Sequence, residues 1–508
     1  MFSKLRNYSK IIIIIIAAAM VITGGLMGYG AYLNRSAPTN APSPYVAKVN
    51  NTNITQQEYY AILRNQAPQS SQLTRSQIIP FKLSVLDSLI EREVILQNAE
   101  EMQLKPQVSD KDVEDYINKI LEANEMTKEE LVNNLENQGI NYADLERDIK
   151  KSLEQSDLIK QVREKSYSNV TVTEEEIQRA YEQVHPLIII KGFKDDQKAA
   201  EEKIREALSK IKAGTSFADV AKEYSDIDNS DLGFIGRDSG YLPEEVIKEA
   251  FALKKGEVSE VITGPEAYYL IKVVDKKLAT GKDYEEAKAG IKDRLLKQKQ
   301  SKAFNNWLEN AKAEAEIEIL DPTLKGYEAL RKGNYELAVQ ELAKALEMNP
   351  LPSIYTYLAH AYHGNKQLAK ALETYDKAIE EYPDDWELHF SYGNFLAGLE
   401  DPDKEKALAQ YDKASELAGE DFMAHYQLYL AYNSLEAEEK AQAEMDKLKE
   451  IQEKIQKEQE EFQKANKEAN SATSEDTASS EVKEKTVSTE ANNKQTANQQ
   501  TAETSNNQ

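Results

Sequence analysis

The sequence contains no cysteine among its 508 residues and only five histidines. The absence of cysteine excludes disulfides, thiolate nucleophiles, thiolate zinc sites and the lipid-modified cysteine of bacterial lipoproteins. Positive charge is also scarce, with 63 lysines and arginines against 88 aspartates and glutamates and a formal net charge of -25. Because binding to a phosphate backbone requires concentrated lysine and arginine, we expect no nucleic-acid partner.

One long stretch lacks charge altogether. Residues 11–33 are uncharged and mostly apolar, and they lie between Lys10 and Arg35. A helix needs about 20 apolar residues to cross the hydrocarbon layer, whereas the apolar region of a secretory signal spans about 7–15 residues. The length therefore favours an uncleaved transmembrane helix at 11–33, followed by a proline-containing linker at 34–44.

The flanking charges predict the orientation of this helix. Three cations lie within residues 1–10, and only Arg35 follows the apolar stretch closely. Because cationic flanks stay in the cytoplasm, we expect a single-pass protein of the cell membrane with residues 1–10 cytoplasmic and the bulk of the chain extracytoplasmic. The alternative is a signal peptide cleaved near Ala37 or Ala41, which also places the chain outside the cytoplasm.

Residues 45–180 combine a short strand pattern at their start with amphipathic helices. A hydroxyl N-cap is followed three residues later by an acidic residue at Ser109, Thr127 and Thr173, which is the capping-box pattern. One predicted helix carries an apolar face made of Leu83, Leu86, Leu89, Ile90, Val94 and Ile95. This region is therefore expected to be mainly helical.

The pattern changes in residues 181–278. A β-branched run at 187–190 predicts a strand, residues 197–213 and 217–224 predict helices, and residues 268–274 predict a closing strand. Strand, helices and strands in this order predict a compact α+β domain.

Several strings in this region carry a family resemblance. Residues 217–225, Asp231-Leu-Gly233, 250–259 and 268–273 resemble a parvulin-type peptidyl-prolyl isomerase domain. The flanking segments Val46-Ala-Lys-Val49, 86–99 and 170–177 resemble the chaperone domain of SurA-type and PrsA-type extracytoplasmic foldases. The resemblance implies a helical chaperone domain at 45–180, an inserted parvulin domain at 181–278, and a helix within 279–320 that returns to the chaperone domain.

Residues 321–455 form a predicted repeat array. Ala338, Ala371, Ala407 and Ala441 recur at spacings of 33, 36 and 34 residues. This period resembles the tetratricopeptide repeat, a helix pair that stacks into an all-α solenoid with a groove for a protein partner. A helical bundle without true repeats is the alternative, but amphipathicity alone does not produce this period.

The polar composition of 456–508 predicts a disordered tail. The expected fold class is thus multidomain.

The parvulin resemblance implies an apolar pocket for a proline ring. The leucine, methionine and phenylalanine positions of the family pocket fall on Leu232, Leu242 and Val246. Phe251 anchors this match and is expected to belong to the substrate-binding set. All of these residues are apolar, so the resemblance implies that a proline can still be held.

The polar part of the family site departs from the pattern. Its acidic position falls on Asp226 or Asp228, in a loop that is shorter than in typical members. Tyr269 stands where the family has a histidine, and the nearby threonine position falls on Gly264.

The other family histidine has two candidate positions. Alignment of the strand places Leu187 there, while His185 lies two residues away on the same predicted face. An imidazole and a phenol can share a hydrogen bond, which would pair His185 with Tyr269. The alternative is that His185, a lone histidine near a strand end, has a structural role. The candidate catalytic residues are His185, Asp226, Asp228 and Tyr269, and the sequence leaves open whether isomerase activity survives.

The remaining histidines, His360, His363, His389 and His425, all lie in the repeat array. Their spacing is explained by helix packing, and no acidic residue stands at an obvious helical offset from the first two. We therefore expect neither a metal ion nor a cofactor.

The interpretation that follows is a membrane-anchored extracytoplasmic folding factor, a parvulin-type isomerase and chaperone for exported proteins. Its expected partners are unfolded or newly translocated polypeptides with X-Pro bonds, a protein bound in the repeat groove, and the membrane through the N-terminal helix. The alternative is a catalytically inactive chaperone or a scaffold for envelope protein complexes.

Overall fold

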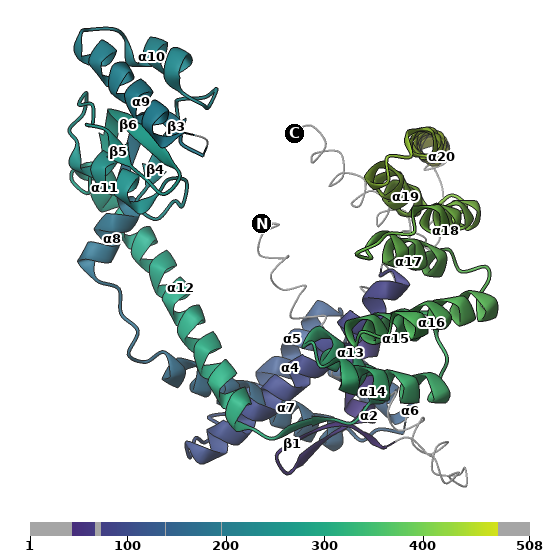
Figure 1. Ribbon diagram of the computed structural model, residues 1–508. Helices are drawn as coiled ribbons and strands as arrows, with labels where there is room; N and C mark the ends of the chain where they lie inside the picture. The colour runs from purple at the N-terminus through teal and green to yellow at the C-terminus, as the bar shows by residue number, and fades with distance from the viewer. Residues whose placement is uncertain (1–42, 67–72, 138, 195, 476–508) are drawn as a thin grey trace. The chain divides into compact units, whose positions relative to one another are not determined.

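The computed structural model describes residues 43–66, 73–137, 139–194 and 196–475 (Figure 1). The first of two compact units comprises the described chain up to Leu73 together with Pro80–Leu324, and the second comprises Thr74–Ile79 and the chain from Lys325 onward. No helix within the described ranges is both long and apolar enough to cross a bilayer. The predicted transmembrane helix at 11–33 lies outside the described residues.

A small antiparallel sheet joins the start and the end of the first unit. Its strands are β1 (Tyr45–Val49), β2 (Thr52–Thr55) and β7 (Ile317–Ile319), in the order β2-β1-β7. Asn50 adopts a φ of 50° in the turn after β1, a left-handed conformation that asparagine tolerates better than most residues. The Asn50 side-chain oxygen accepts the N–H of Glu316 at 2.8 Å, which connects this turn to the segment before β7.

Amphipathic helices make up most of the remainder of the first unit. They are α2 (Gln56–Asn65), α4 (Arg75–Glu101), α5 (Asp110–Ala123), α6 (Lys128–Asn137), α7 (Tyr142–Ser166), α8 (Glu174–Tyr181) and α12 (Lys282–Glu314). The predicted apolar face of α4 is buried along its whole length. The capping boxes at Ser109, Thr127 and Thr173 are all formed, so these sequence predictions are confirmed.

The long helix α12 packs back onto the helices that precede the α+β domain. Phe304 and Leu308 of α12 share a buried cluster with Ile95 of α4 and Val162 of α7. The Lys312 ammonium adds an ion pair with Glu91 at 3.0 Å. Helix α12 therefore contacts both α4 and α7, and β7 follows it directly.

The α+β domain is a four-stranded antiparallel sheet covered by helices on both faces. Its strands are β3 (Gln183–Gly192), β4 (Ile235–Gly236), β5 (Ile262–Thr263) and β6 (Ala267–Lys277), in the order β4-β3-β6-β5. Helices α9 (Gln197–Lys212) and α10 (Phe217–Tyr224) cover one face, where Ile189 and Leu270 are buried. Helix α11 (Glu244–Ala252) covers the other face, where Ile188 and Ile271 are buried.

The second unit consists mainly of paired helices that stack in sequence order. They are α13 (Pro322–Arg331), α14 (Tyr335–Met348), α15 (Pro352–Gly364), α16 (Leu368–Glu381), α17 (Trp386–Ala397), α18 (Lys404–Leu417), α19 (Phe422–Ser434) and α20 (Glu438–Glu475). The periodic alanines, Ala338, Ala371, Ala407 and Ala441, are at most 2% exposed. Each allows close helix contact, which is the physical reason for their period.

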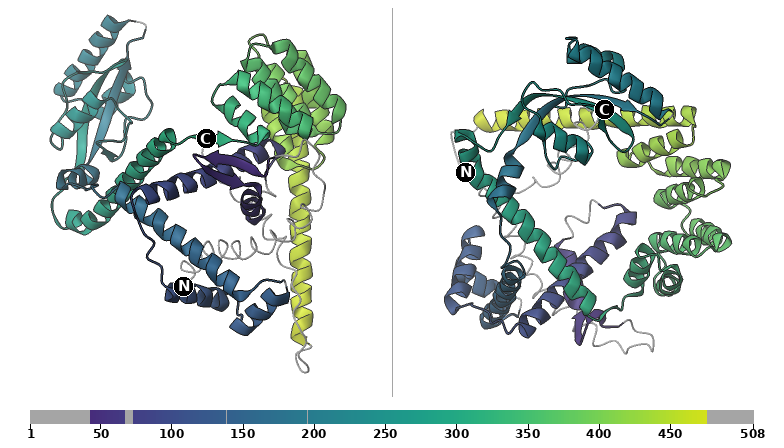
Figure 2. Two further views of the ribbon diagram at one scale, coloured as in Figure 1. Left: turned by 90° about the horizontal axis from the view of Figure 1, so that it is seen from below. Right: turned by 60° about the vertical axis from the view of Figure 1, so that its left-hand side comes forward.

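The last helix is longer than the sequence analysis predicts. Figure 2 shows α20 as one long helix, and it continues to Glu475, beyond position 456 where the polar tail was expected to begin. The segment after 456 is rich in glutamate, lysine, glutamine and alanine, which favour helix even without an apolar face. The rest of the predicted tail lies outside the described residues.

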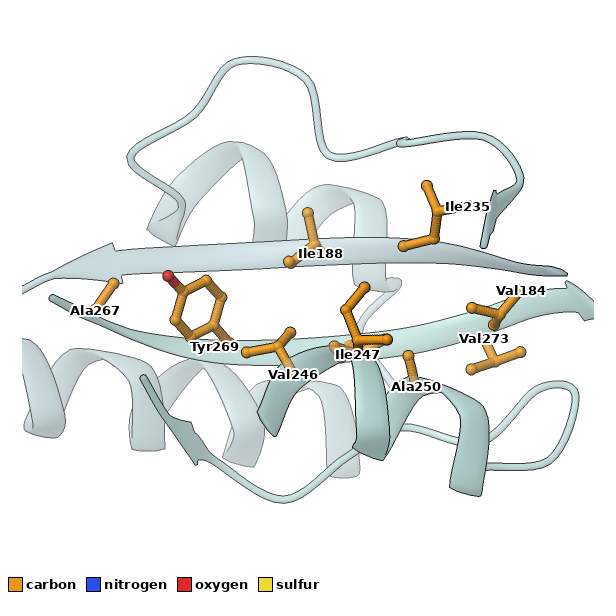
Figure 3. Close-up of a cluster of buried hydrophobic side chains, with 10 residues drawn as sticks. Val184, Ile188, Ile235, Val246, Ile247, Ala250, Ala267, Tyr269 and Val273 are labelled. Carbon is orange, nitrogen blue, oxygen red and sulfur yellow. The ribbon is translucent and has the colours of Figure 1, made fainter. Parts of the chain in front are cut away.

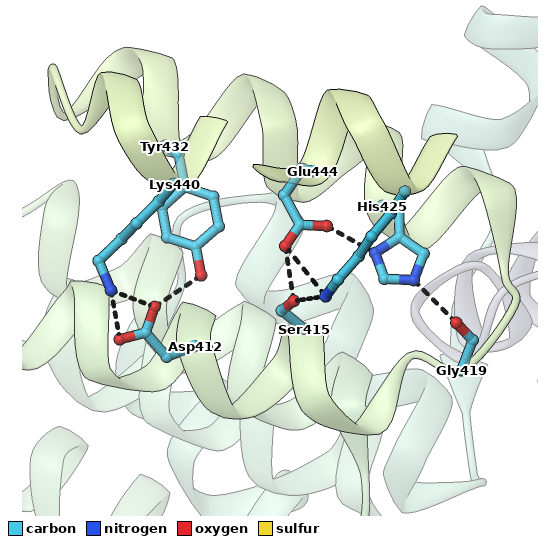
Figure 4. Close-up of polar contacts among 8 residues, drawn as sticks. Asp412, Ser415, Gly419, His425, Tyr432, Lys440 and Glu444 are labelled. Carbon is cyan, nitrogen blue, oxygen red and sulfur yellow. Dashed lines mark hydrogen bonds and ion pairs between the residues drawn. The ribbon is translucent and has the colours of Figure 1, made fainter. Parts of the chain in front are cut away.

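Two histidines occupy equivalent buried positions in successive repeats but have different partners. The His425 ring nitrogens contact Glu444 Oε2 at 2.5 Å and the Gly419 carbonyl oxygen at 2.9 Å (Figure 4). In the preceding repeat, His389 contacts Gln410 Oε1 at 2.7 Å and the Pro383 carbonyl oxygen at 3.1 Å.

The two pairs differ in the side chain beside the histidine, which is a carboxylate at Glu444 and an amide at Gln410. A carboxylate and a carbonyl can only accept, so both nitrogens of His425 carry protons beside the ionised Glu444, whereas an amide side chain can donate as well as accept. The hydrogen bond to Glu444 raises the pKa of His425 against the opposing effect of burial. Burial opposes ionisation of Glu444, but hydrogen bonds from His425 and Ser415 outweigh it and lower the pKa of that carboxyl.

The charged pair predicts pH-dependent stability of the repeats. Because the folded pKa of His425 is raised, its contribution is complete below the ordinary histidine value of about 6.5 and is lost as pH rises through the folded pKa. Glu444→Gln recreates the histidine–glutamine pair of the preceding repeat. We expect it to lower the free energy of unfolding near pH 6 by about 1–3 kcal/mol and to reduce the loss of stability between pH 6 and 9.

Urea unfolding followed by Trp386 fluorescence in a Trp307→Phe background measures this, since Trp386 lies in α17. His389→Gln is the matched control and should leave the pH dependence unchanged. An equal pH dependence in the wild type and Glu444→Gln would contradict the charged-pair interpretation.

Candidate functional site

The face of the sheet beneath α11 carries an apolar surface built from several elements. Its floor contains Ile188, Tyr269 and Val246, which are buried in one cluster (Figure 3). Half-buried side chains packed against this floor include Ile227, Leu232, Leu242, Phe251 and Ile262. We call this set, floor and rim together, the apolar face.

The structure brings the four predicted substrate-binding residues together on the apolar face. Leu232, Leu242 and Phe251 are partly exposed at its rim. Val246 is fully buried at 0% exposure, so it contributes to the floor rather than to the accessible wall. An apolar wall of this kind can bind a compact ring without any charged partner.

Phe251 is held in place by charged neighbours that the sequence analysis did not identify. The Arg237 guanidinium lies over its ring, with 4.0 Å from the guanidinium carbon to the ring centroid, and also pairs with Glu182 at 2.8 Å. Lys276 donates to the Phe251 carbonyl at 2.6 Å, and burial, followed by the nearby Arg237, lowers the pKa of this lysine. These contacts fix the end of α11 beside the apolar face.

Tyr269 occupies space that Gly264 leaves open. The strand register pairs Tyr269 with Ile190 on one side and Ile262 on the other. A Cβ atom added at Gly264 would lie 2.6 Å from Cε2 of the Tyr269 ring. Burial, and then the charges of Glu266 and Glu245, raise the pKa of Tyr269, so its hydroxyl keeps its proton at neutral pH and can donate a hydrogen bond.

The structure does not bring His185 and Tyr269 together. His185 pairs in register with Asp275, whereas Tyr269 pairs with Ile190. Ile190 lies five residues after His185 along β3, a separation of about 16 Å at the usual rise of a strand. A register shift between His185 and Pro186, where β6 has one extra residue, also lies between the two positions. The hydrogen bond expected between the imidazole and the phenol is therefore not available.

His185 instead pairs with an acidic residue outside the predicted set. Its Nε2 lies 2.6 Å from Asp231 Oδ1, and its ring packs on Phe234. The N–H of Gly233, and then His185, lower the pKa of Asp231. Asp231 belongs to one of the strings that carry the family resemblance, and this was the signal that could have identified it.

The two alternative acidic residues lie in different environments. Asp226 accepts the N–H of Gly192 at 2.8 Å, forms an ion pair with Lys191, and donates its own N–H to Ile190, the strand partner of Tyr269. Asp228 is exposed, while Ile227 between them packs against the apolar face. Asp226 is therefore the one anchored to β3 near Tyr269.

The close approach of Gly264 and Tyr269 predicts a coupled pair. Gly264→Ala should lower the free energy of unfolding by about 1–3 kcal/mol, because the added methyl overlaps a buried ring. The same change in a Tyr269→Ala background should cost much less, because the ring is gone. A double-mutant cycle by urea denaturation, followed by Trp307 fluorescence in a Trp386→Phe background, measures the coupling.

Gly290→Ala is the control, since a Cβ at this exposed helical position meets nothing within 4 Å. It should stabilise α12 slightly. Equal effects of Gly264→Ala in both backgrounds would show that the ring does not fill this space.

Comparison with known proteins finds three families along the chain. The SurA-like N-terminal domain matches residues 1–159, the PPIC-type PPIASE domain matches 172–289, and the tetratricopeptide repeat matches 323–386 and 358–421.

Curated relatives agree with this assignment. Foldase protein PrsA of Halalkalibacterium halodurans is 27% identical over 48% of this chain and 71% of its own length. Foldase protein PrsA of Clostridium tetani is 26% identical over 57% of this chain and 90% of its own length. Chaperone SurA of Nitrosospira multiformis is 27% identical over 46% of this chain and 56% of its own length. The chain is a homologue of the PrsA and SurA proteins, with a SurA-like N-terminal domain, a PPIC-type parvulin domain and C-terminal tetratricopeptide repeats.

Proposed function

We propose that this protein is a membrane-anchored extracytoplasmic folding factor that binds X-Pro segments of exported polypeptides on the apolar face and accelerates their isomerisation. Membership of the PrsA and SurA group, a family of peptidyl-prolyl isomerases and chaperones, supports the folding role. The observation that carries the proposal is the apolar face itself, with Leu232, Leu242 and Phe251 at its rim.

The proposed division of labour follows the predicted domain boundaries. Residues 45–180 and 279–320 hold unfolded segments, 181–278 act on X-Pro bonds, and 321–455 bind a protein partner. The uncharged stretch at 11–33 supports the membrane anchor, and the cations before it support an extracytoplasmic location for the rest.

The proposed mechanism requires no covalent step. The barrier to rotation about a peptide bond is about 18–20 kcal/mol because rotation breaks amide resonance. In the twisted transition state the prolyl nitrogen regains a lone pair that can accept a hydrogen bond. The apolar face would hold the proline ring, and the Tyr269 hydroxyl would donate to this nitrogen more strongly in the transition state than in the ground state.

A second function is favoured by a specific observation. His185 contacts Asp231 and lies far from Tyr269 along the sheet. The polar part of the site therefore has one candidate hydrogen-bond donor, the Tyr269 hydroxyl, rather than a histidine pair. A catalytically inactive chaperone or envelope scaffold would retain the apolar face for binding and lack the rate acceleration.

A protease-coupled assay on the full chain distinguishes the two functions. It uses a chromogenic peptide that is cleaved only when its X-Pro bond is trans. We expect the wild type to accelerate isomerisation and Tyr269→Phe, which removes only the hydroxyl, to lower the rate at least tenfold, in the range typical of a lost donor. Tyr241→Phe is the matched control, because Tyr241 is 77% exposed on the same domain.

Tyr269→His should retain or raise activity, because an imidazole N–H can also donate to the prolyl nitrogen. If both the wild type and Tyr269→His show only the uncatalysed rate, isomerisation is excluded. The protein would then act as a catalytically inactive chaperone or scaffold.

A further inference from the structure

A pocket lies in the second unit between α15 and α17, and Arg75 and Ser76 of the segment Thr74–Ile79 in the same unit line part of it. Its lining residues from α15, α17 and the N-cap of α17 include Thr356, Tyr357, Asp385, Glu387 and Ser391. Two of these are carboxylates, so the pocket is anionic.

The deepest contact is made by an arginine. Asp385 has a side chain that is only 5% exposed, and one of its oxygens accepts the Leu388 N–H at 3.2 Å to cap α17. Its other oxygen forms an ion pair with the Arg75 guanidinium. Because a buried carboxylate without a partner is costly, this position requires a cation.

A second carboxylate recognises the start of a helix. Glu387 accepts the backbone N–H groups of Arg75 at 3.2 Å and Ser76 at 3.4 Å. The first backbone N–H groups of a helix have no partner within the helix and carry partial positive charge. Glu387 therefore binds a feature that an extended peptide or a helix interior does not present.

A third contact depends on a proline. Pro80 lies inside α4 and has no N–H, so it cannot donate to the carbonyl of Ser76 four residues earlier. The Tyr357 hydroxyl donates to this freed carbonyl at 2.6 Å. The pocket thus binds three features together. They are an arginine, the first N–H groups of a helix, and a carbonyl that lacks its helical hydrogen bond because a proline lies five residues after the arginine.

The fit of this segment is incomplete. The Arg75 side chain is 59% exposed, and a cavity of about 40 Å³ remains beside it. A segment with the same three features from another polypeptide can therefore compete for the same groups.

We propose that the pocket between α15 and α17 is a binding site for an arginine-bearing helix start followed by proline, and that residues Thr74–Ile79 occupy it in cis as a competitor. The proposal deepens the partner-binding role proposed for the repeats and rests on it. The partner it fits is a basic polypeptide segment of the form Arg-Ser-x-x-x-Pro.

The test uses the full chain and a fluorescent peptide of residues 73–81 with blocked ends, followed by anisotropy. We expect the Arg75→Ala chain, whose pocket lacks the competing guanidinium, to bind this peptide at least tenfold more tightly than the wild type. Adding Asp385→Asn to this variant should abolish the gain. Asparagine keeps the oxygen that caps α17, so the repeat fold is retained while the charge is removed.

Arg64→Ala is the matched control for loss of an exposed arginine and should bind as the wild type does. Peptides with alanine in place of the arginine or of the proline should bind more weakly to the Arg75→Ala chain. The proposal is overturned if Arg75→Ala shows no gain, or if the gain survives Asp385→Asn. Either result would leave the isomerase assay of the parvulin domain unaffected, so failure of this site and failure of the folding role are distinguishable.

Discussion

The pairing of β7 with β1 is the constraint on which the first unit depends. It joins two segments that lie at opposite ends of this part of the sequence, and it requires α12 to return alongside α4 and α7. The α+β domain is consequently inserted between α8 and α12, and these two flanking helices contact each other. The hydroxyl of Tyr284 in α12 donates to Glu174 of α8 at 2.7 Å, where the chain leaves and re-enters.

Within the α+β domain, the apolar face lies on one of the two faces of a single sheet. Helices α9 and α10 cover one face and α11 covers the other, where the rim residues Leu232, Leu242 and Phe251 stay partly exposed. Glycine at 264 leaves room for the Tyr269 ring, because a Cβ atom at this position would lie 2.6 Å from Cε2 of the ring.

Features set by neighbours in sequence were predictable. The capping boxes at Ser109 and Thr173, the apolar stripe of α4 and the period of the repeat alanines each depend on local spacing, and the structure confirms them. The family resemblance also singled out Leu232, Leu242 and Phe251, and these side chains pack against the same buried cluster.

Features set by contacts between residues far apart in sequence could not be predicted. The separation of His185 from Tyr269 depends on the register of β3 with β6, which leaves no signal in composition. The occupation of the repeat pocket by Thr74–Ile79 joins residues more than 300 positions apart. The contact between Gly264 and Tyr269 needed the strand geometry, although both residues were already notable as departures from the family pattern.

The central claim is that the apolar face binds proline-containing segments. It is tested most directly by methyl NMR of the full chain with labelled leucine, titrated with a short X-Pro peptide and with the same peptide carrying alanine for proline. The account predicts that the Leu232 and Leu242 methyl signals shift with the proline peptide and remain in place with the alanine peptide. Unchanged signals from both leucines at saturating proline peptide would contradict it.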